Sequence, residues 1–496
     1  MTHTPGELRR KTLSGLFWQF LAVGGQQVVQ LLSIGVIARA IDPKDVGLFV
    51  ILLTGIGLIE SLTLFMGEQA TIASPRGVER EYLDTVFTVR VLRSIAISVL
   101  LCALAPAFAW YYAKPEYEGR HWLPGLFLMM SLTGFIDGFQ SPGRAARLKG
   151  LDFRRVAFCD FLASALGATI TITLAVVEKS VWALMIGHIS TAVMRTVMSY
   201  VAGPHRPRFL LDRTALQDLL HYSKGAAGAP FLLFLTYASS AAIIPVLLSE
   251  VMLAVFEFAG RLAKIPENIF LKVLGPVAVP AYAQLRSDMP RLANAWLNAV
   301  QAFAQVAAPM TVVMVWCGGA LPAFLFGRPE YGSVSGLFGL QCVYGGISAL
   351  TAVVGPLFWA IGQPHRDRRA QFVRCIVIYA LGIPATMHFG IMGFAVASCI
   401  SIGVTLLLVV VQAQRVLSIS TWRLLGAMKN GTLAAAAIGG ALLLVDLLAS
   451  PEGVWRIVAG GAIGGPVLGL LALRLLRQRR GAPIAVSASP TEELVN

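Results

Sequence analysis

Apolar runs of membrane length dominate the hydrophobic and polar pattern of the chain. Such runs hold about 20 mostly apolar residues, the length that a helix needs to cross a bilayer, and charged or Pro- and Gly-rich connections separate them. The pattern predicts fourteen spans, near residues 13–37, 46–66, 84–112, 122–142, 156–177, 181–203, 224–248, 251–276, 296–322, 333–361, 370–388, 390–412, 431–449 and 454–476. We therefore expect an all-α integral membrane protein with about 14 transmembrane helices.

The distribution of Arg and Lys over the connections tests this arrangement. If the spans alternate in direction, 26 of the 40 Arg and Lys residues fall on the side of the N-terminus and only seven on the opposite side. Cytoplasmic connections of membrane proteins carry the excess of Arg and Lys, so both termini are expected in the cytoplasm. Arg9, Arg10 and Lys11 precede a full-length span without a cleavable signal pattern, which predicts an uncleaved first helix.

Two sequence matches at nearly one offset indicate an internal repeat. Residues 37–51 align with 244–258, and residues 180–193 align with 390–403. Such a repeat predicts two lobes of six helices, related by a pseudo-two-fold axis along the membrane normal, plus two C-terminal helices. The expected organisation is an N-terminal lobe (1–205), an amphipathic cytoplasmic linker (206–223), a C-terminal lobe (224–414), a second amphipathic linker (415–430), spans 13 and 14 (431–476) and a disordered cytoplasmic tail (477–496).

The composition of the chain supports a membrane protein and argues against several kinds of binding and catalytic site. Charged residues make up 13% of the chain, whereas soluble domains carry about 25%. The net charge of +14 lies mostly in the predicted cytoplasmic connections, which argues against a nucleic-acid partner. The sequence contains no nucleotide-binding loop and no HExxH or GxSxG motif, and its six cysteines are scattered singly. We expect a transporter or a membrane scaffold, with no enzymatic activity, metal or cofactor.

One predicted span, Ala254–Lys272, carries charges that a bilayer helix normally excludes. Drawn as a regular helix, it gathers several polar side chains within an arc of roughly 80°; these are Glu257, Arg261, Lys264, Asn268 and Lys272. A charge at mid-membrane costs at least about 2.5–3.5 kcal/mol, so such residues usually face a bundle interior or a water-filled cavity. The pattern predicts a cationic stripe that lines a cavity. The alternative is that Glu257 and Lys272 lie near helix ends and reach the interface.

Other polar side chains in the predicted spans belong to the N-terminal half. In the first span, Gln19, Gln26 and Gln30 share a face with Ser33. These amides could either join helices by hydrogen bonds or contact a hydroxyl-rich cargo. The remaining candidates are Glu60, Arg90, Arg93, Asp137, His188 and Arg195. For Glu60 with Arg90 or Arg93 we favour a structural ion pair over a coupling role, and for His188 with Arg195 we weigh a buried core position against a cavity position.

Several stretches resemble a known family over most of residues 10–415. They are GLFWQFLAVGGQQVVQLLSIGVIARAIDPKDVGLF (15–49), LDTVFTVRVLRS (83–94), GFQSPGRAARLKGLDFRR (138–155), SVWALMIG (180–187), RPRFLLD (206–212), FEFAGRLAKIP (256–266) and GPLFWAIGQP (355–364). They look like the Wzx-like bacterial polysaccharide exporters of the multidrug/oligosaccharidyl-lipid/polysaccharide flippase superfamily, especially the branch serving colanic acid and succinoglycan-like exopolysaccharides. The likeness departs in the seventh span, where similar proteins often carry an Asp and residues 236–248 here are apolar.

The resemblance implies a function. Such proteins flip an undecaprenyl-pyrophosphate-linked oligosaccharide across the bacterial inner membrane by alternating access, for exopolysaccharide or lipopolysaccharide biosynthesis. The implied partners are that lipid, the surrounding membrane lipids, and the polymerase and co-polymerase of the same pathway. Two alternatives remain open, an ion-coupled multidrug or metabolite antiporter and a non-transporting scaffold of a glycan-assembly complex.

Overall fold

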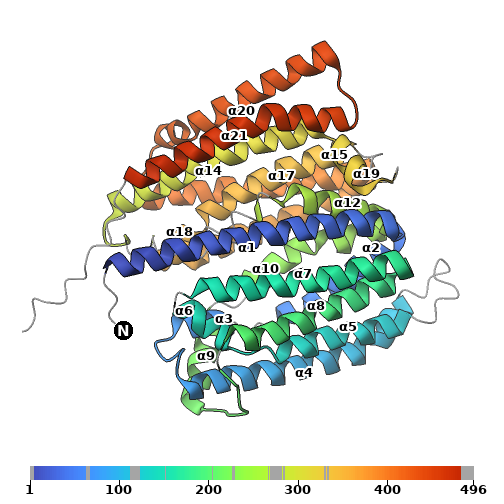
Figure 1. Ribbon diagram of the computed structural model, residues 1–496, viewed down its shortest axis with the longest axis vertical. Coiled ribbons are helices and arrows are strands. Elements are labelled where there is room, and N and C mark those ends of the chain that lie inside the picture. The colour runs from blue at the N-terminus through green and yellow to red at the C-terminus, as the bar shows by residue number, and fades with distance from the viewer. Residues whose placement is uncertain are drawn as a thin grey trace, which may run out of the picture.

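The computed structural model describes residues 5–62, 67–111, 123–150, 152–203, 205–225, 229–265, 267–268, 282, 285–328, 331 and 335–481. Every regular element within these residues is a helix, as Figure 1 shows. Nine of the described helices are long and apolar enough to cross a membrane. The predicted class, an all-α multi-pass membrane protein, is confirmed, whereas the count of fourteen spans stays a prediction.

The N-terminal lobe consists of long helices with three short ones at one end. The long helices are α1 (Pro5–Ala40), α2 (Pro43–Leu62), α4 (Arg80–Tyr111), α5 (Leu123–Gly138), α7 (Phe153–Glu178) and α8 (Val181–Ala202), and the short ones are α3 (Gly67–Ala73), α6 (Gly143–Lys149) and α9 (Arg213–Gly225). Small residues bring the long helices close together, as is usual in membranes. A Cβ at Gly167 would lie 2.2 Å from the Thr191 hydroxyl, so α7 and α8 are in backbone contact.

The C-terminal lobe contains both short and long helices. They are α10 (Ala229–Tyr237), α11 (Ser239–Leu247), α12 (Glu250–Ala263), α14 (Met289–Cys317), α15 (Ala320–Phe326), α17 (Ser335–Val354), α18 (Pro356–Ala360) and α19 (Pro364–Leu417), and α20 (Thr421–Ala449) and α21 (Val454–Gly481) follow the lobe. The long α19 contains two arms that meet at Gly390, whose φ of 60° and ψ of −146° suit glycine alone. The predicted boundary between spans at residues 389–390 falls at this kink.

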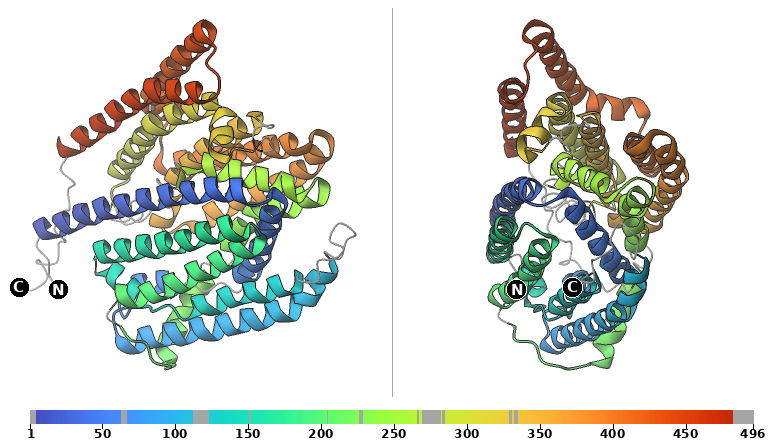
Figure 2. Two further views of the ribbon diagram at one scale, coloured as in Figure 1. Left: turned by 45° about the vertical axis from the view of Figure 1, so that its right-hand side comes forward. Right: turned by 90° about the vertical axis from the view of Figure 1, so that its right-hand side faces the viewer.

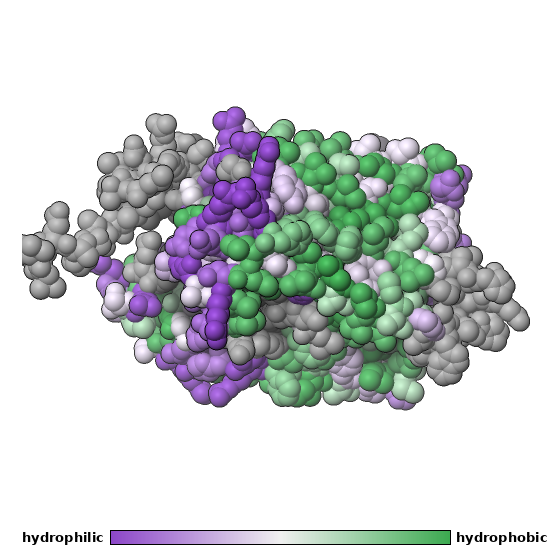
Figure 3. Space-filling model, turned by 90° about the horizontal axis from the view of Figure 1, so that it is seen from below, coloured by the Kyte–Doolittle hydropathy of each residue, from purple (hydrophilic) through white to green (hydrophobic). Residues whose placement is uncertain are grey.

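A hydrophilic band lies near one end of the molecule. α1 begins and α21 ends at the same end of the bundle (Figure 2). Seen from below, a hydrophilic band covers this end and a hydrophobic belt adjoins it (Figure 3). The side of the membrane that each end faces remains a prediction from the distribution of Arg and Lys.

The two predicted linkers have different structures. Residues 205–212 have no regular secondary structure and lead into α9, whereas residues 415–430 form no separate element. There α19 ends at Leu417, Ser418 takes a left-handed conformation, and α20 runs without a break from Thr421 into the predicted thirteenth span. α21 extends to Gly481, and the rest of the predicted tail lies outside the described residues.

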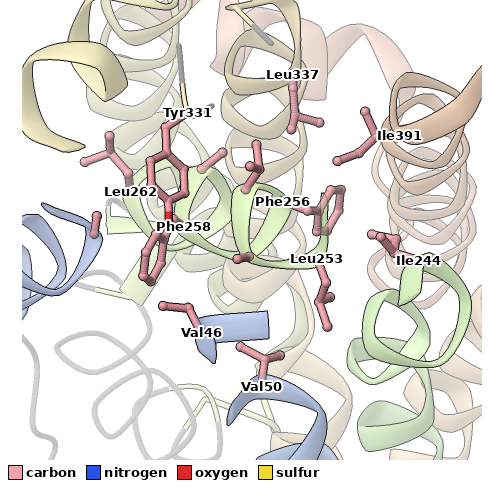
Figure 4. Packing of buried hydrophobic residues seen from close by; sticks show 14 of the residues in the cluster. Val46, Val50, Ile244, Leu253, Phe256, Phe258, Leu262, Tyr331, Leu337 and Ile391 are labelled. Atoms are coloured by element: carbon pink, nitrogen blue, oxygen red, sulfur yellow. The ribbon is translucent and has the colours of Figure 1, made fainter. Parts of the chain in front are cut away.

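The two lobes are tied together at the end opposite the start of α1. Figure 4 shows Val46 and Val50 of α2 beside Leu253 and Phe258 of α12, all within one buried hydrophobic cluster. The helices approach so closely that a Cβ at Gly47 would lie 2.1 Å from the carbonyl oxygen of Glu250.

A second link between the lobes lies beside this packing. Arg39, in the last turn of α1, donates hydrogen bonds to the carbonyl oxygens of Phe324 at 2.6 Å and Leu325 at 3.1 Å, which end α15. Cations favour helix C-termini, where carbonyl groups lack helical partners. Arg328 returns a hydrogen bond to the carbonyl of Arg39 at 3.1 Å.

Candidate functional site

Four helices of the C-terminal lobe bring a group of charged and aromatic side chains together in the bundle. Lys264 follows the last residue of α12, Tyr237 ends α10, Tyr344 lies on α17 and Arg374 lies on α19. With Glu267, these residues form what we call the cation–tyrosine cluster. It is the densest group of charges within the described part of the C-terminal lobe's predicted spans.

The tyrosine rings hold the two cations of the cluster. Nζ of Lys264 lies 4.9 Å from the ring centre of Tyr344 and 5.6 Å from that of Tyr237. Cζ of Arg374 lies 5.3 Å from the Tyr237 ring centre and 5.8 Å from the Tyr344 ring centre, and Arg374 also donates a hydrogen bond to the Tyr344 hydroxyl. Each such contact contributes about 0.5–1 kcal/mol at an exposed site and about 2 kcal/mol or more when the cation is desolvated. The rings therefore fix the positions of both positive charges.

Glu267 supplies the negative charge of the cluster. Its side chain interacts electrostatically with Lys264 and Arg374, and its Oε1 accepts a hydrogen bond from the Ser348 hydroxyl at 2.7 Å. Glu267 and Arg374 are 4% and 2% exposed, whereas Lys264 is half-buried. The described residues of the cluster thus comprise two cationic side chains and one carboxyl group, and Lys264 is the more exposed of the two cations.

The predicted cationic stripe is only partly realised. α12 ends at Ala263, and Lys264 departs from helical geometry with a ψ of 4° before helical residues resume at Ile265, so the arc drawn for one regular helix is interrupted there. The sequence explains this end, because Pro266 has no N–H to continue the helical hydrogen bonds. Arg261 is half-buried in the last turn of α12, and the N–H of Asn268 donates to the carbonyl of Lys264 at 2.9 Å. Lys272 lies outside the described residues.

Arg261 lies within electrostatic range of the N-terminal lobe. It interacts with His188 of α8, whose ring packs edge-on against Phe49 of α2 with 5.9 Å between ring centres. His188 also interacts with Asp137 and Arg195, and these two side chains approach each other to 3.9 Å. The structure therefore adds Asp137 to the pair of His188 and Arg195 that the sequence analysis considered together, and places Arg261 within electrostatic range of His188.

The other N-lobe candidates form two hydrogen-bonded groups. Arg93 donates a hydrogen bond to the carbonyl oxygen of Glu60 at 2.9 Å, and the two side chains interact electrostatically. Arg90 donates to the side-chain oxygen of Gln140 at 2.9 Å, and the amide nitrogen of Gln140 donates to Asp137 at 2.5 Å. Arg93, rather than Arg90, is the hydrogen-bonding neighbour of Glu60, while Arg90 joins the Asp137 group through Gln140.

The glutamine side chains of α1 differ in burial, although their spacing predicts one shared face. Gln26 is half-buried and Gln30 is exposed, whereas the neighbouring Gln27, which the sequence analysis did not single out, is buried. The side chain of Gln19 lies outside the described part of the structure. The hypothesis of an amide face for sugar hydroxyls therefore depends on Gln26 and Gln30.

Residues missed from the sequence carry much of the C-lobe site. Arg374 lies within a predicted span, so the rule that marked Arg261 as a costly intramembrane charge applied to it as well. Glu267 lies inside the marked stretch but off the helical arc, and only the end of α12 brings it into the cluster. Tyr237 and Tyr344 carried no sequence signal, because aromatic residues are common in membrane helices. Among the described residues, no three His, Cys, Asp or Glu side chains gather as a metal site.

Comparisons with known proteins assign the chain to a group. A family described as polysaccharide biosynthesis protein matches residues 36–331, more than half of the chain. The succinoglycan biosynthesis transport protein ExoT of Rhizobium meliloti is 23% identical over 362 residues, covering 73% of this chain and 71% of that protein. The lipopolysaccharide biosynthesis protein WzxC of Escherichia coli is 21% identical, covering 71% and 70%.

Solved structures share the fold. The lipid II flippase MurJ in an inward closed conformation superposes with a TM-score of 0.68 at 12% identity, covering 93% of this chain and 99% of MurJ. An inward-facing multidrug resistance transporter of the MATE family has a TM-score of 0.61 at 16% identity, covering 79% and 94%. Because a flippase and a drug transporter both match, the fold alone does not distinguish their cargoes.

Proposed function

Because the chain belongs to the polysaccharide biosynthesis protein family, we propose that it flips an undecaprenyl-pyrophosphate-linked oligosaccharide repeat unit across the bacterial inner membrane. The unit then enters exopolysaccharide or lipopolysaccharide biosynthesis. The relatives named above as transport and biosynthesis proteins of succinoglycan and lipopolysaccharide support this assignment.

One observation carries the cargo chemistry, the excess positive charge of the cation–tyrosine cluster inside the bundle. A pyrophosphate offers several anionic oxygens, and Lys and Arg bind such oxygens through short charge-assisted hydrogen bonds. Lys264 and Arg261 are half-buried, whereas Arg374 is buried. In this proposal Lys264 and Arg261 bind the pyrophosphate, and Arg374 acts through the tyrosine rings that it shares with Lys264.

The N-lobe groups suit the sugar part of the same cargo. His188, Asp137, Arg195 and the amides of Gln26 and Gln30 can donate or accept hydrogen bonds with hydroxyl groups. Cytoplasmic loading would begin with the lobes joined at α2 and α12, as the contacts of Gly47 and Arg39 describe. Release on the other side requires those contacts to separate, which is alternating access by rocking of the two lobes.

The antiporter and scaffold alternatives receive less support. A carrier of cationic drugs would be opposed by the positive cluster, because like charges repel strongly where water is excluded. A scaffold would not need a buried charge group, since each such group costs free energy to keep in the membrane. The proposal includes cytoplasmic termini, no catalytic residue, and the polymerase and co-polymerase as partners.

Deleting the gene and locating the accumulated lipid-linked units tests this function. We expect single repeat units to accumulate in the inner leaflet, where an impermeant glycan-modifying enzyme added outside spheroplasts cannot reach them. Accumulation of single units in the outer leaflet would contradict a flippase and indicate a failed polymerase instead. Complementation with the intact gene is the control.

A further inference from the structure

The segment that leads into α9, residues 205–212, belongs to neither the cation–tyrosine cluster nor the polar groups of the N-terminal lobe. We call it the linker loop. α9 lies beside α3 at the end of the bundle where α1 begins (Figure 1). We infer that the linker loop binds lipid: its apolar tip enters the bilayer, and its arginines bind the headgroups of anionic phospholipids. This inference does not depend on the proposed cargo.

The linker loop is held against α4 by hydrogen bonds along its backbone. It has no regular secondary structure, and alternate N–H groups donate to side-chain oxygens of α4. These bonds run from Arg208 to Asp84 at 2.9 Å, from Leu210 to Thr88 at 3.0 Å and from Asp212 to Thr85 at 2.9 Å. The buried Asp84 carboxylate also lies 2.9 Å from Nε2 of His205. The loop therefore has a defined position on α4.

These hydrogen bonds indicate how deep the linker loop lies. α4 begins at Arg80 and its predicted span covers residues 84–112, so Thr88 lies inside that span, about 12 Å along the helix from Arg80. Leu210 donates to Thr88, whereas Asp212 returns to Thr85, nearer the start of α4. The bilayer core has no water to pair with free N–H groups, so a non-helical chain at this depth needs acceptors from the protein. The hydroxyl and carboxylate groups of α4 supply them.

The tip of the linker loop exposes three consecutive large apolar side chains. Phe209, Leu210 and Leu211 are 69%, 43% and 53% exposed. The Phe209 ring also rests against Phe87 of α4, with 5.5 Å between ring centres. A contiguous exposed apolar patch marks a surface that contacts a membrane or another protein. Because the tip lies beside a predicted span, the bilayer is the occupant that fits it.

Arginines flank the apolar tip on both sides. Arg206 and Arg208 precede it and Arg213 follows it; all three are exposed, and none forms an ion pair within the described part of the chain. The neighbouring Asp212 carboxylate is already engaged by Arg76 at 3.5 Å and by the start of α9. Each arginine near an anionic membrane surface strengthens binding roughly fivefold, and a guanidinium group matches the geometry of phosphate oxygens. The linker loop therefore fits an anionic phospholipid such as phosphatidylglycerol.

Photocrosslinking in reconstituted membranes tests the inference. Full-length protein with benzoylphenylalanine in place of Phe209 is placed in nanodiscs of equal parts phosphatidylcholine and phosphatidylglycerol and irradiated, and lipid adducts are quantified by mass spectrometry. We expect phosphatidylglycerol adducts to exceed phosphatidylcholine adducts on the order of fivefold. Arg206→Gln with Arg208→Gln should bring this ratio towards one without reducing total lipid adducts, because the apolar tip is unchanged. The control is Arg291→Gln, which removes an exposed arginine of α14 and should leave the ratio unchanged.

The other outcomes would overturn the inference. Equal adducts of the two lipids before the arginines are changed, or a ratio that the double-arginine variant does not alter, would contradict recognition of anionic headgroups. A lack of lipid adducts would place the tip outside the bilayer, and adducts with a protein instead of lipid in irradiated cells would make it a protein interface. An unchanged melting temperature would show that the double-arginine variant is folded. The nanodisc lipids carry neither a polyprenyl chain nor a pyrophosphate, so a failure here leaves the proposed function intact.

Discussion

The charged side chains in the predicted spans of the two lobes differ in their neighbours and in their exposure. In the N-terminal lobe, Arg195 faces Asp137 at 3.9 Å with about half of the Arg195 side chain exposed, and Arg93 lies beside Glu60. In the C-terminal lobe, Lys264 and Arg374 both lie over the rings of Tyr237 and Tyr344. The N-lobe carboxylates Asp137 and Glu60 each have an arginine beside them and lie partly open, whereas the C-lobe cations Lys264 and Arg374 lie against tyrosine rings and Arg374 is buried.

This difference teaches which lobe suits which part of the proposed cargo. Matched, solvated charges offer mild hydrogen-bonding groups, appropriate to neutral sugar hydroxyls. An enclosed positive excess suits a phosphate, because low dielectric strengthens the attraction. Our hypothesis is an asymmetric site, with phosphate towards the C-terminal lobe and sugar towards the N-terminal lobe.

The largest effect is expected from removing the reachable C-lobe cations. Replacing Arg261 and Lys264 together with Ala should reduce polymer export at least tenfold, since two charge-assisted contacts to the pyrophosphate are lost. Export is measured as secreted polymer, with protein amount in the membrane measured by immunoblot. The matched control is Arg291→Ala, whose side chain is 75% exposed. Wild-type export by the double variant would contradict the proposal that the C-lobe cations bind the pyrophosphate.

A several-fold effect is expected where the two lobes join. Gly47→Ala places a Cβ where only 2.1 Å separates it from the Glu250 carbonyl, so α2 and α12 must separate. Val50 is buried in this interface, and we expect an introduced Val50→Cys to react several-fold faster with an impermeant maleimide in the Gly47→Ala background. Gly440→Ala is the control, because its Cβ would meet no atom within 4 Å. Unchanged labelling would mean that this contact does not hold the lobes together.

A smaller effect is expected from neutralising the matched N-lobe pair. Asp137→Asn with Arg195→Gln keeps the net charge and the hydrogen-bonding groups, so export should fall only about two- to fivefold and stability should change by less than about 1 kcal/mol. The measurement is export at several expression levels, together with thermal unfolding. A loss as large as that of the Arg261 and Lys264 double variant would show that the two lobes are not as different as proposed.

The smallest effect is expected at Asp212, outside the membrane. Its carboxylate accepts hydrogen bonds from the Thr214 hydroxyl and the Ala215 N–H at the start of α9 and lies near Arg76, and these contacts lower the pKa of Asp212. A lowered pKa means that the stabilisation is present at neutral pH and is lost as the pH falls through the value in the folded protein. Asp212→Ala should lower the melting temperature by roughly 1–2 °C at pH 7, with normal export. Wild type and variant should converge at acid pH, and a difference that grows there would contradict this sign.

The sequence predicted the fold class well because lipid imposes strong rules. Membrane-length apolar runs and the asymmetry of Arg and Lys are consequences of bilayer thickness and charge, and they need no tertiary information. The boundary at Gly390 also followed from the pattern. By contrast, residues 415–430 were expected as a flat linker, and the continuous α20 shows that an amphipathic pattern cannot distinguish a surface helix from the end of a span.

The site was harder to predict, for a geometric reason. Arg261 and Lys264 stood out because a charge in an apolar run is costly wherever it lies. Their partners Arg374, Tyr237 and Tyr344 come from three other helices, and no spacing within one segment reveals such a contact. Pro266 is the sequence signal that α12 ends early. With this end taken into account, Glu267 rather than Lys272 would have been chosen as a candidate.

Binding of polyprenyl lipids tests the central claim most directly. Purified protein in nanodiscs is titrated with undecaprenyl pyrophosphate and with undecaprenyl monophosphate, and bound lipid is quantified by native mass spectrometry for wild type and Lys264→Ala. We predict that wild type prefers the pyrophosphate on the order of tenfold, and that Lys264→Ala loses this preference while still binding the tail. Equal binding of the two lipids by wild type, or an unchanged preference in Lys264→Ala, would contradict the account.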